Sequence, residues 1–296
     1  MVHGQSGRAI RPSQSLDPGS DVTTDSSLLG DYLRARRARV QPQDVGLPHN
    51  PNRRVRGLRR EEVADLAGIS LEYYTRLEQG HPYQLSESVL AGLAGALRLD
   101  AASAEYLYRL ALPLPGTHRA GAAAALSPLV TALVDQWAGI PVYVIDRNQD
   151  VRAANDLAQA MFRQFALPGA NCVQATFTAP ADDRATESWQ RTARTLVAAL
   201  RFRGDPADPR LQEIVGELSV SDADFRAMWA DHEARPYDSG VAPVLIEGFG
   251  FGDIAWQMLN VPGDLYMVLW LAPPGSFAAA AIAHLSGAGA TRELAS

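Results

Sequence analysis

Apolar residues between positions 58 and 80 recur at helical spacing in two short groups, and a glycine separates the groups. The first group predicts a short helix in which the small side chain of Ala64 lets a second helix cross closely. Gly68 supplies the turn, because a residue without Cβ adopts positive φ at little cost. Ser70 is a good N-cap for the helix that follows. The pattern therefore predicts a helix-turn-helix.

The second helix of this motif separates an inner from an outer side. Tyr74 and Leu77 lie three residues apart and face inward. The outer side is then left for a partner, such as the edges of bases in the DNA major groove. It carries Leu71, Glu72, Tyr73 and Arg76. An ordinary helical hairpin explains the apolar spacing equally well, but it does not require a small residue, a glycine and an N-cap at these offsets together.

The motif GLRREEVADLAGIS followed by YYTRLEQG resembles the XRE-type (Cro/repressor-like) bacterial regulators. More narrowly, the chain resembles their MmyB-like branch, which joins such a domain to a PAS-like ligand-binding domain. The resemblance covers about residues 28–112 and continues more weakly over about 127–286. It implies an ion pair between Arg37 and Glu78 that holds the first and the recognition helices together. It also implies a fatty-acyl-like ligand in the second domain.

The rest of the N-terminal pattern completes an all-α domain over residues 27–112. Helical periodicity predicts a first helix at Leu28–Val40 and a fourth at Ser86–Leu97, and Asp100 caps a fifth. Between the first two helices, Gln41–Arg56 is rich in Pro, Gly and Asn and reads as a long loop. Residues 1–26, rich in Ser, Asp, Gly and Pro, read as a disordered tail.

Charge along the chain is uneven. The whole chain carries a net charge of −6, but residues 29–60 hold nine arginines against two aspartates, a net of +7. Such a local patch is enough to attract DNA phosphates. The solvated face that a charge run usually forms is the alternative, but the patch directly adjoins the motif. We expect phosphate contacts from Arg59 and Arg60, phosphate or minor-groove contacts from the loop, and base-edge contacts from the motif. The loop residues are Arg53, Arg54 and Arg56. The base-edge residues of the motif are Glu72, Tyr73 and Arg76, and Ser70 and Leu71 complete its DNA-binding set.

Residues 113–127 read as a linker rich in Pro, Gly and Ala, and residues 128–286 as a second domain. This domain opens with a helix at Leu129–Trp137, followed by a predicted hairpin of strands 142–146 and 151–155. Helices are expected at about 183–203, 208–217 and 221–232, and strands at 241–247, 252–261 and 265–271. Two early strands, intervening helices and three late strands predict an α+β, PAS-like domain with a five-stranded antiparallel sheet. Residues 287–296 are left as a tail.

A candidate ligand pocket comes from apolar residues of the second domain. The expected helix at 221–232 carries an apolar face that ends in His232, a possible polar partner for a carboxylate. The candidate lining is Phe162, Phe225, Trp229, His232, Trp256, Met258 and Met267. For each of them the alternative is a plain hydrophobic core. We therefore keep two functions in view: a DNA-binding regulator that senses a small apolar ligand, and one whose second domain serves only dimerisation or protein interaction.

Other chemistry finds little support in the chain. Asn171-Cys172 departs at once from the flavin-reactive motif of light-sensing PAS proteins, and the histidines lack metal-ligand or haem spacing. The chain shows no phosphate-binding loop and no nucleophile elbow, so we expect neither a cofactor nor an enzyme. No apolar run approaches the ~20 residues of a membrane span, and a single cysteine suits the cytoplasm.

We also expect a homodimer, because one helix-turn-helix covers few base pairs and regulators of this type usually bind as two-fold pairs. The second domain is the better candidate for the dimer contact.

Overall fold

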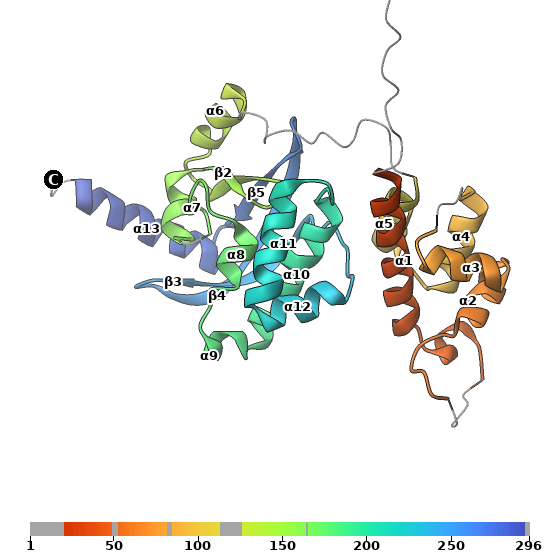
Figure 1. Cartoon of the computed structure of the whole chain (residues 1–296). Coiled ribbons are helices and arrows are strands. Elements are labelled where there is room, and N and C mark those ends of the chain that lie inside the picture. Colours follow the sequence, from red (N-terminus) through yellow and green to blue (C-terminus); the bar gives the residue numbers. More distant parts are fainter. Residues whose placement is uncertain (1–20, 49–52, 82–84, 113–125, 164, 294–296) are drawn as a thin grey trace, which may run out of the picture.

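The structure, a computed structural model, describes residues 21–48, 53–81, 85–112, 126–163 and 165–293. It contains an N-terminal group of helices and a C-terminal domain in which helices pack on one five-stranded sheet (Figure 1). This two-domain arrangement, all-α and then α+β with an antiparallel sheet, confirms the predicted fold class.

The N-terminal domain contains the five predicted helices around one core. Their bounds are α1 Asp21–Arg39, α2 Arg60–Ala67, α3 Leu71–Glu78, α4 Glu87–Ala96 and α5 Ala101–Ala111, with a short 3-10 turn, η1, at Pro42–Val45. The fully buried side chains include Tyr32, Leu58, Tyr74 and Leu107. Apolar stripes at helical spacing thus meet in a single core.

Local signals set the ends of these helices. Gly68 ends α2 in the left-handed region with φ of 69°, and the hydroxyl of Ser70 accepts a hydrogen bond from the Tyr73 amide at 3.1 Å. Asp100 caps α5 in the same way through the Ser103 amide at 2.9 Å. These caps satisfy amide groups that would otherwise lack partners at the helix starts.

The C-terminal domain is built on a sheet of order β2-β1-β5-β4-β3, antiparallel throughout. The strands are β1 Val142–Asp146, β2 Val151–Ala154, β3 Ser239–Ile246, β4 Gly250–Val261 and β5 Leu265–Leu271. Its helices are α6 Pro128–Gln136, α7 Asp156–Met161, α8 Cys172–Thr176, α9 Ala181–Arg184, α10 Glu187–Arg203, α11 Pro209–Ser221, α12 Ala223–Ala230 and α13 Phe277–Glu293. The early hairpin and the three late strands lie where the periodicity predicted them.

Asn155 connects the hairpin to the helices. Its side-chain oxygen accepts from the amides of Ala158 and Val142 at 2.9 and 3.2 Å, while its side-chain nitrogen donates to the carbonyls of Trp137 and Ile140. One buried side-chain amide therefore caps α7 and also accepts a hydrogen bond from the first residue of β1. This matches its predicted place at the start of the helix after the hairpin.

The two faces of the sheet have different cover. The face we call inner carries residues such as Ile254 and Trp270, which pack with α7 and α13. The face we call outer carries Met267, Leu269 and Val144, which pack under α6. A third cluster, formed by α8, α10, α11 and α12, lies beside the sheet.

Two predicted tails are partly wrong. Helix α1 begins at Asp21, inside the expected tail 1–26, because neither Pro nor Gly interrupts the chain between Asp21 and Leu29. Helix α13 continues to Glu293, inside the expected tail 287–296. Phe277, Ile282 and Leu285 of α13 pack on the sheet domain, but after Leu285 the helix holds only small and polar residues, so no apolar stripe indicates that it continues. Residues 1–20 and 294–296 lie outside the described ranges.

Most of the expected linker, residues 113–125, also lies outside the described ranges, but direct contacts join the two domains. Phe202 at the end of α10 is buried against the N-terminal core, with its ring 6.2 Å from that of Tyr106 in α5. The Arg109 guanidinium lies 4.8 Å over the Phe202 ring. Two ion pairs, Arg39–Asp231 at 3.2 Å and Arg235–Asp100 at 2.8 Å, flank this packing. Among the described helices, none is long and apolar enough to cross a membrane.

Candidate nucleic-acid interface and ligand site

The outer side of α3 is open to solvent. Leu71 is 47% exposed, Glu72 and Arg76 are also exposed, and Tyr73 is half-buried against the domain core. In Figure 1, α2 and α3 lie on the side of the N-terminal domain that faces away from the sheet domain. The predicted DNA-binding residues of the motif therefore form one accessible surface, apart from Ser70, whose hydroxyl is already engaged as the N-cap.

A buried carboxylate lies directly beneath this surface. Glu78 is only 1% exposed and accepts hydrogen bonds from Arg37 Nε at 2.5 Å and Arg37 Nη2 at 3.2 Å. The ion pair that the resemblance implied is thus present. Arg60 adds a second bond to Glu78, from Nε to Oε2 at 2.6 Å. Burial alone raises the pKa of Glu78, but the hydrogen bonds from Arg37 and Arg60 outweigh it and hold the pKa below its ordinary value.

Arg60 was expected to contact phosphate, and the structure gives it a further role. It joins the start of α2 to Glu78 at the end of α3, while its side chain stays 46% exposed. Nothing in the sequence pattern placed Arg60 next to Glu78, because the two residues are 18 positions apart and meet only through the turn.

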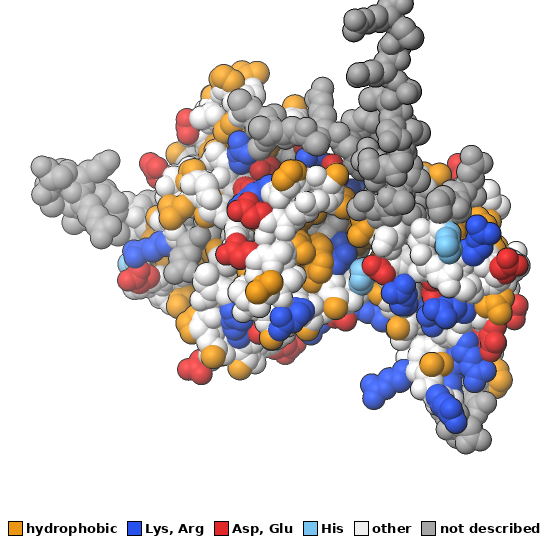
Figure 2. All heavy atoms as spheres, in the orientation of Figure 1, with side chains coloured by type: hydrophobic (Ala, Val, Ile, Leu, Met, Phe, Trp, Pro, Cys, Tyr) orange, Lys and Arg blue, Asp and Glu red, His pale blue; other side chains and the backbone are white. Residues whose placement is uncertain are grey.

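The loop arginines divide into two kinds. Arg53 is nearly buried and makes two hydrogen bonds to Glu62, at 2.6 and 2.5 Å, so it fastens the loop to α2. Arg54 and Arg56 are exposed. Arg59 is also exposed, and its side chain contacts Glu61 at 3.1 Å. Figure 2 shows arginine side chains gathered over the loop between α1 and α2, so the basic patch is a real surface feature.

The candidate ligand residues do not form one pocket. Phe162, Trp256 and Met258 come together on the inner face of the sheet, and all three remain partly exposed there. Phe225 and Trp229 pack instead in the helical cluster beside the sheet, with stacked rings 5.8 Å apart.

Met267 is wrongly assigned to that pocket. It pairs with Leu259 in the sheet register and lies on the outer face under α6, fully buried. Its neighbour Val268 pairs with Met258 and faces the opposite side. Adjacent residues of a strand point to opposite faces, so Met258 and Met267 cannot line the same cavity.

His232 also lies elsewhere than expected. Helix α12 ends at Ala230, and His232 follows it in a turn with φ of 50°, so it leaves the helical face that holds Phe225 and Trp229. Its Nδ1 lies 3.4 Å from Arg201 Nη1 at the contact between the domains. Burial, followed by the charge of Arg201, lowers the pKa of His232 to about 4. The ring is therefore neutral near pH 7 and is not a ready cation for a carboxylate.

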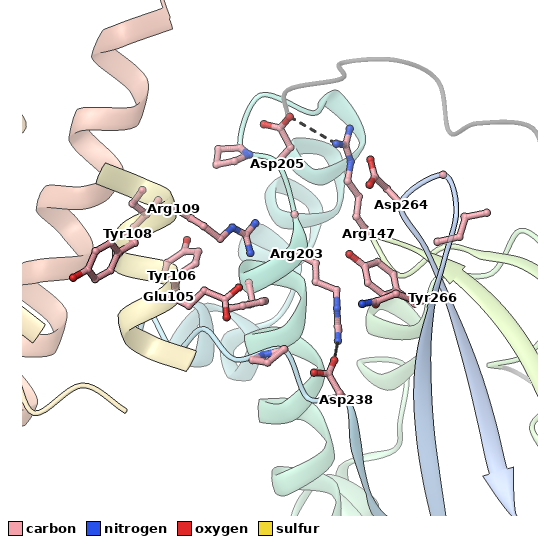
Figure 3. Close-up of a pocket in the computed structure, with 18 of the residues that line it drawn as sticks. Glu105, Tyr106, Tyr108, Arg109, Arg147, Arg203, Asp205, Asp238, Asp264 and Tyr266 are labelled. Carbon is pink, nitrogen blue, oxygen red and sulfur yellow. Dashed lines mark hydrogen bonds and ion pairs between the residues drawn. The ribbon is translucent and has the colours of Figure 1, made fainter. Parts of the chain in front are cut away.

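The described part of the chain also forms a pocket between the domains (Figure 3). It has a volume of ≈ 990 Å³ and is lined by both domains, with Tyr106 and Arg109 of α5 facing Arg203 and Tyr266. Arg203 is buried, donates to Asp238 at 2.8 Å, and lies 4.6 Å over the Tyr266 ring. None of the seven candidate ligand residues lines this pocket. Sequence patterns gave no signal for it, because its walls meet only when the two domains dock.

Comparison with known families places both halves of the chain. Residues 126–285 match the model for the MmyB-like transcription regulator ligand binding domain. Residues 28–107 match the model of a helix-turn-helix domain. A comparison with curated proteins gave no significant match. Since the first match alone spans more than half of the chain, the chain belongs to the MmyB-like transcription regulators, with a helix-turn-helix DNA-binding domain before the ligand-binding domain.

Proposed function

We propose that this regulator binds an inverted-repeat operator as a homodimer and changes its affinity when its C-terminal domain takes up a small apolar molecule. The DNA-binding part of this proposal rests on one observation. The outer side of α3 is exposed, and the buried Glu78 beneath it fixes the helix in place. In this proposal Glu72, Tyr73 and Arg76 read base edges. Phosphates are contacted by the exposed arginines Arg54, Arg56, Arg59 and Arg60.

The ligand half rests on the inner face of the sheet. Trp256 and Met258 face the covering helices, yet neither is fully buried. Large apolar side chains that face a covering layer without filling it mark space that an apolar molecule can occupy. We propose that the ligand lies against Phe162, Trp256 and Met258. The family resemblance indicates that this ligand is a fatty-acyl-like molecule.

Direct contact between the domains supports a route for the signal. Helix α10 runs from the sheet domain to Phe202, which packs against α5 of the DNA-binding domain. A ligand changes DNA affinity only if it favours one arrangement of the dimer over another. Ordering of the helices over the inner face would act on α5 through this contact.

The DNA half is tested by selecting an operator from random duplexes and measuring affinity for it and for random DNA. The selected site should hold two half-sites about 34 Å apart, one helical turn. Arg76→Ala should cost roughly 1–3 kcal/mol on the selected site and relax the base choice. Arg56→Ala is the matched control; it should weaken both duplexes equally and lower the salt slope by about one charge. Equal losses on both duplexes for Arg76→Ala would move Arg76 to the phosphate class.

The ligand half is tested by operator affinity with and without a saturated fatty acid such as palmitate. Ala242 lies on the inner face of the sheet opposite Ile254, so Ala242→Trp should fill the proposed space. We expect a 5- to 150-fold change in affinity for the wild type, the usual scale of such coupling, and none for Ala242→Trp. Ala242→Val serves as the matched control and should keep the response. If all three proteins ignore the fatty acid, the second domain acts as an interaction module or takes another ligand.

A further inference from the structure

The outer face of the sheet is covered over only part of its width. Helix α6 packs on β1 and β5, where Met267 and Leu269 are buried. The cover ends at the next strand: Leu259 of β4 pairs directly with Met267 but is 44% exposed, whereas Met267 is 0% exposed. The outer face of β4 and the edge strand β3 is therefore open.

The open part of this face is strongly apolar. It carries Val241, Leu245, Phe251, Leu259 and Leu271, which are 61%, 70%, 66%, 44% and 41% exposed. The register joins them into one surface, because Leu245 pairs with Phe251, Val241 with Ala255, and Ala255 with Leu271. We call these five residues the apolar face.

The exposed area of the apolar face is large enough to form the core of a protein–protein interface. A large side chain carries about 150–250 Å² when fully exposed, so the five together present on the order of 500 Å². A patch of that size is as large as the largest apolar patch on a typical monomer, and such patches are often functional. A standard interface needs roughly 800 Å² from each partner. The apolar face can supply the core of such an interface, and the residues around it then supply the rim.

The near absence of charge on the apolar face indicates which partner binds there. Among the outer-face residues of β3 and β4, Asp253 is the only charged one. Two copies of a chain with net charge −6 repel one another, and they approach at least cost across a face that is almost free of charge. Pro243 lies in the edge strand β3 and lacks an amide hydrogen, which disfavours growth of the sheet along its edge and leaves face-to-face packing.

We infer that the apolar face is the dimer contact of this regulator, and that it packs on the same face of a second copy about a two-fold axis. The inference deepens the proposed homodimer, and it rests on that proposal. In such a contact each residue of the apolar face meets the apolar face of the partner, so one substitution acts twice. The location also leaves α3 uncovered, because α3 belongs to the other domain.

The test is sedimentation equilibrium of the full chain and of Leu245→Glu/Phe251→Glu. We expect the wild type to dimerise and the double variant to raise the dimer Kd by about 100-fold or more. The matched control is Val220→Glu. Val220 is 83% exposed and belongs to helix α11 and not to the apolar face, so the Kd should not change. Because salt screens the repulsion between two copies of net charge −6 and the contact itself is apolar, the wild-type Kd should fall and not rise between about 0.1 and 1 M NaCl.

Circular dichroism tests whether the double variant folds. If it does not fold, the single variant Leu245→Gln replaces it in the measurement of the dimer Kd. A double variant that folds and still dimerises with the wild-type Kd overturns the inference, while the two-fold operator of the proposed function stands on another contact. A wild type that stays monomeric also overturns it, and the apolar face then belongs to a different protein. Ligand response is measured separately by operator affinity, so its failure is distinguishable from either result.

Discussion

At the scale of single residues, Glu78 joins the helices that form the DNA-binding surface. It is a buried carboxylate between two arginines, one from α1 and one from the start of α2. The three side chains therefore tie α1, α2 and α3 together. Removing one partner of a buried pair leaves the other charge uncompensated, and this loss usually costs about 3–5 kcal/mol.

The three residues should not be equal in their effect on stability. Glu78→Ala leaves Arg37 almost buried and unpaired, so it should cost the most, at the upper end of about 3–5 kcal/mol. Arg37→Ala should cost less, because Arg60 still pairs with the carboxylate, and Arg60→Ala least, because Arg60 is 46% exposed. Urea denaturation of the full chain measures the order. If Arg60→Ala proves the most damaging, the triad is misassigned.

The same carboxylate predicts an acid response. Its pKa in the folded chain lies below the ordinary value of 4.5, so the unfolded chain takes up the proton first as the pH falls. The stabilisation from Glu78 is therefore fully present above about pH 4.5 and is lost as the pH falls through the folded pKa.

His232 should give an acid response at higher pH. Its pKa in the folded chain is about 4, against an ordinary 6.5, and it faces Arg201 and, on α1, Asp31, Arg34 and Arg39. Below pH 6.5 only the unfolded chain takes up the proton, so the wild type loses stability between pH 6.5 and about 4. Thermal denaturation as a function of pH should show a smaller loss over this range for His232→Gln. Parallel curves for the two proteins would contradict this assignment.

At the scale of elements, two glycines of α4 differ in a way that the sequence does not reveal. A Cβ at Gly92 would lie 2.5 Å from the carbonyl oxygen of Ala67, so Gly92 allows α4 to cross α2 closely. A Cβ at Gly95 would meet nothing within 4 Å. The two positions therefore differ in whether a neighbouring helix passes close to them: α2 passes close to Gly92, and nothing lies close to Gly95.

Substitution of each glycine by alanine tests this close approach. Gly92→Ala must push α4 away from α2 and should destabilise the domain by roughly 1–3 kcal/mol. Gly95→Ala should stabilise it by up to about 1 kcal/mol, because alanine favours the helix. Chemical denaturation of both variants measures the two signs. A stabilising Gly92→Ala would show that the two helices can separate freely.

At the scale of the whole molecule, the contact between the domains determines how they communicate. Phe202 is the only residue of α10 in the N-terminal core cluster of the described chain. Arg201 beside it is buried, stacks 3.7 Å over the Trp229 ring, and has no carboxylate in ion-pairing distance among the described residues. An apolar anchor next to a buried cation that has no carboxylate partner among the described residues makes a contact that a small change can weaken.

Phe202→Ala should therefore uncouple the domains. Large-to-small substitution at a buried position of this kind costs about 3–5 kcal/mol, here at the contact. We expect calorimetry to show one unfolding transition for the wild type and two for the variant, and the operator response to ligand to fall. Phe165→Ala, in the cluster of the sheet domain, should lower stability without adding a transition. A single transition in Phe202→Ala would mean that other contacts hold the domains together.

Local sequence signals alone were sufficient to predict the helix-turn-helix and the strands. Gly68, Ser70 and the inward pair Tyr74 and Leu77 act within about a dozen residues, so turn, cap and core face can be read from the chain. The alternation of Ile254, Trp256 and Met258 with their neighbours predicted the strand β4 for the same reason, and the motif indicated the family. These features depend on backbone preference and periodicity, which neighbouring residues carry.

Tertiary structure alone decided which distant residues share a site. It placed Met267 under α6 and Met258 on the other face, and it moved His232 from a ligand face to the domain contact. It also paired Arg60 with Glu78 and left the apolar face open. Each of these outcomes depends on how one element lies against another. Hydrophobic periodicity shows that a side is apolar, but it does not show which element, if any, covers that side.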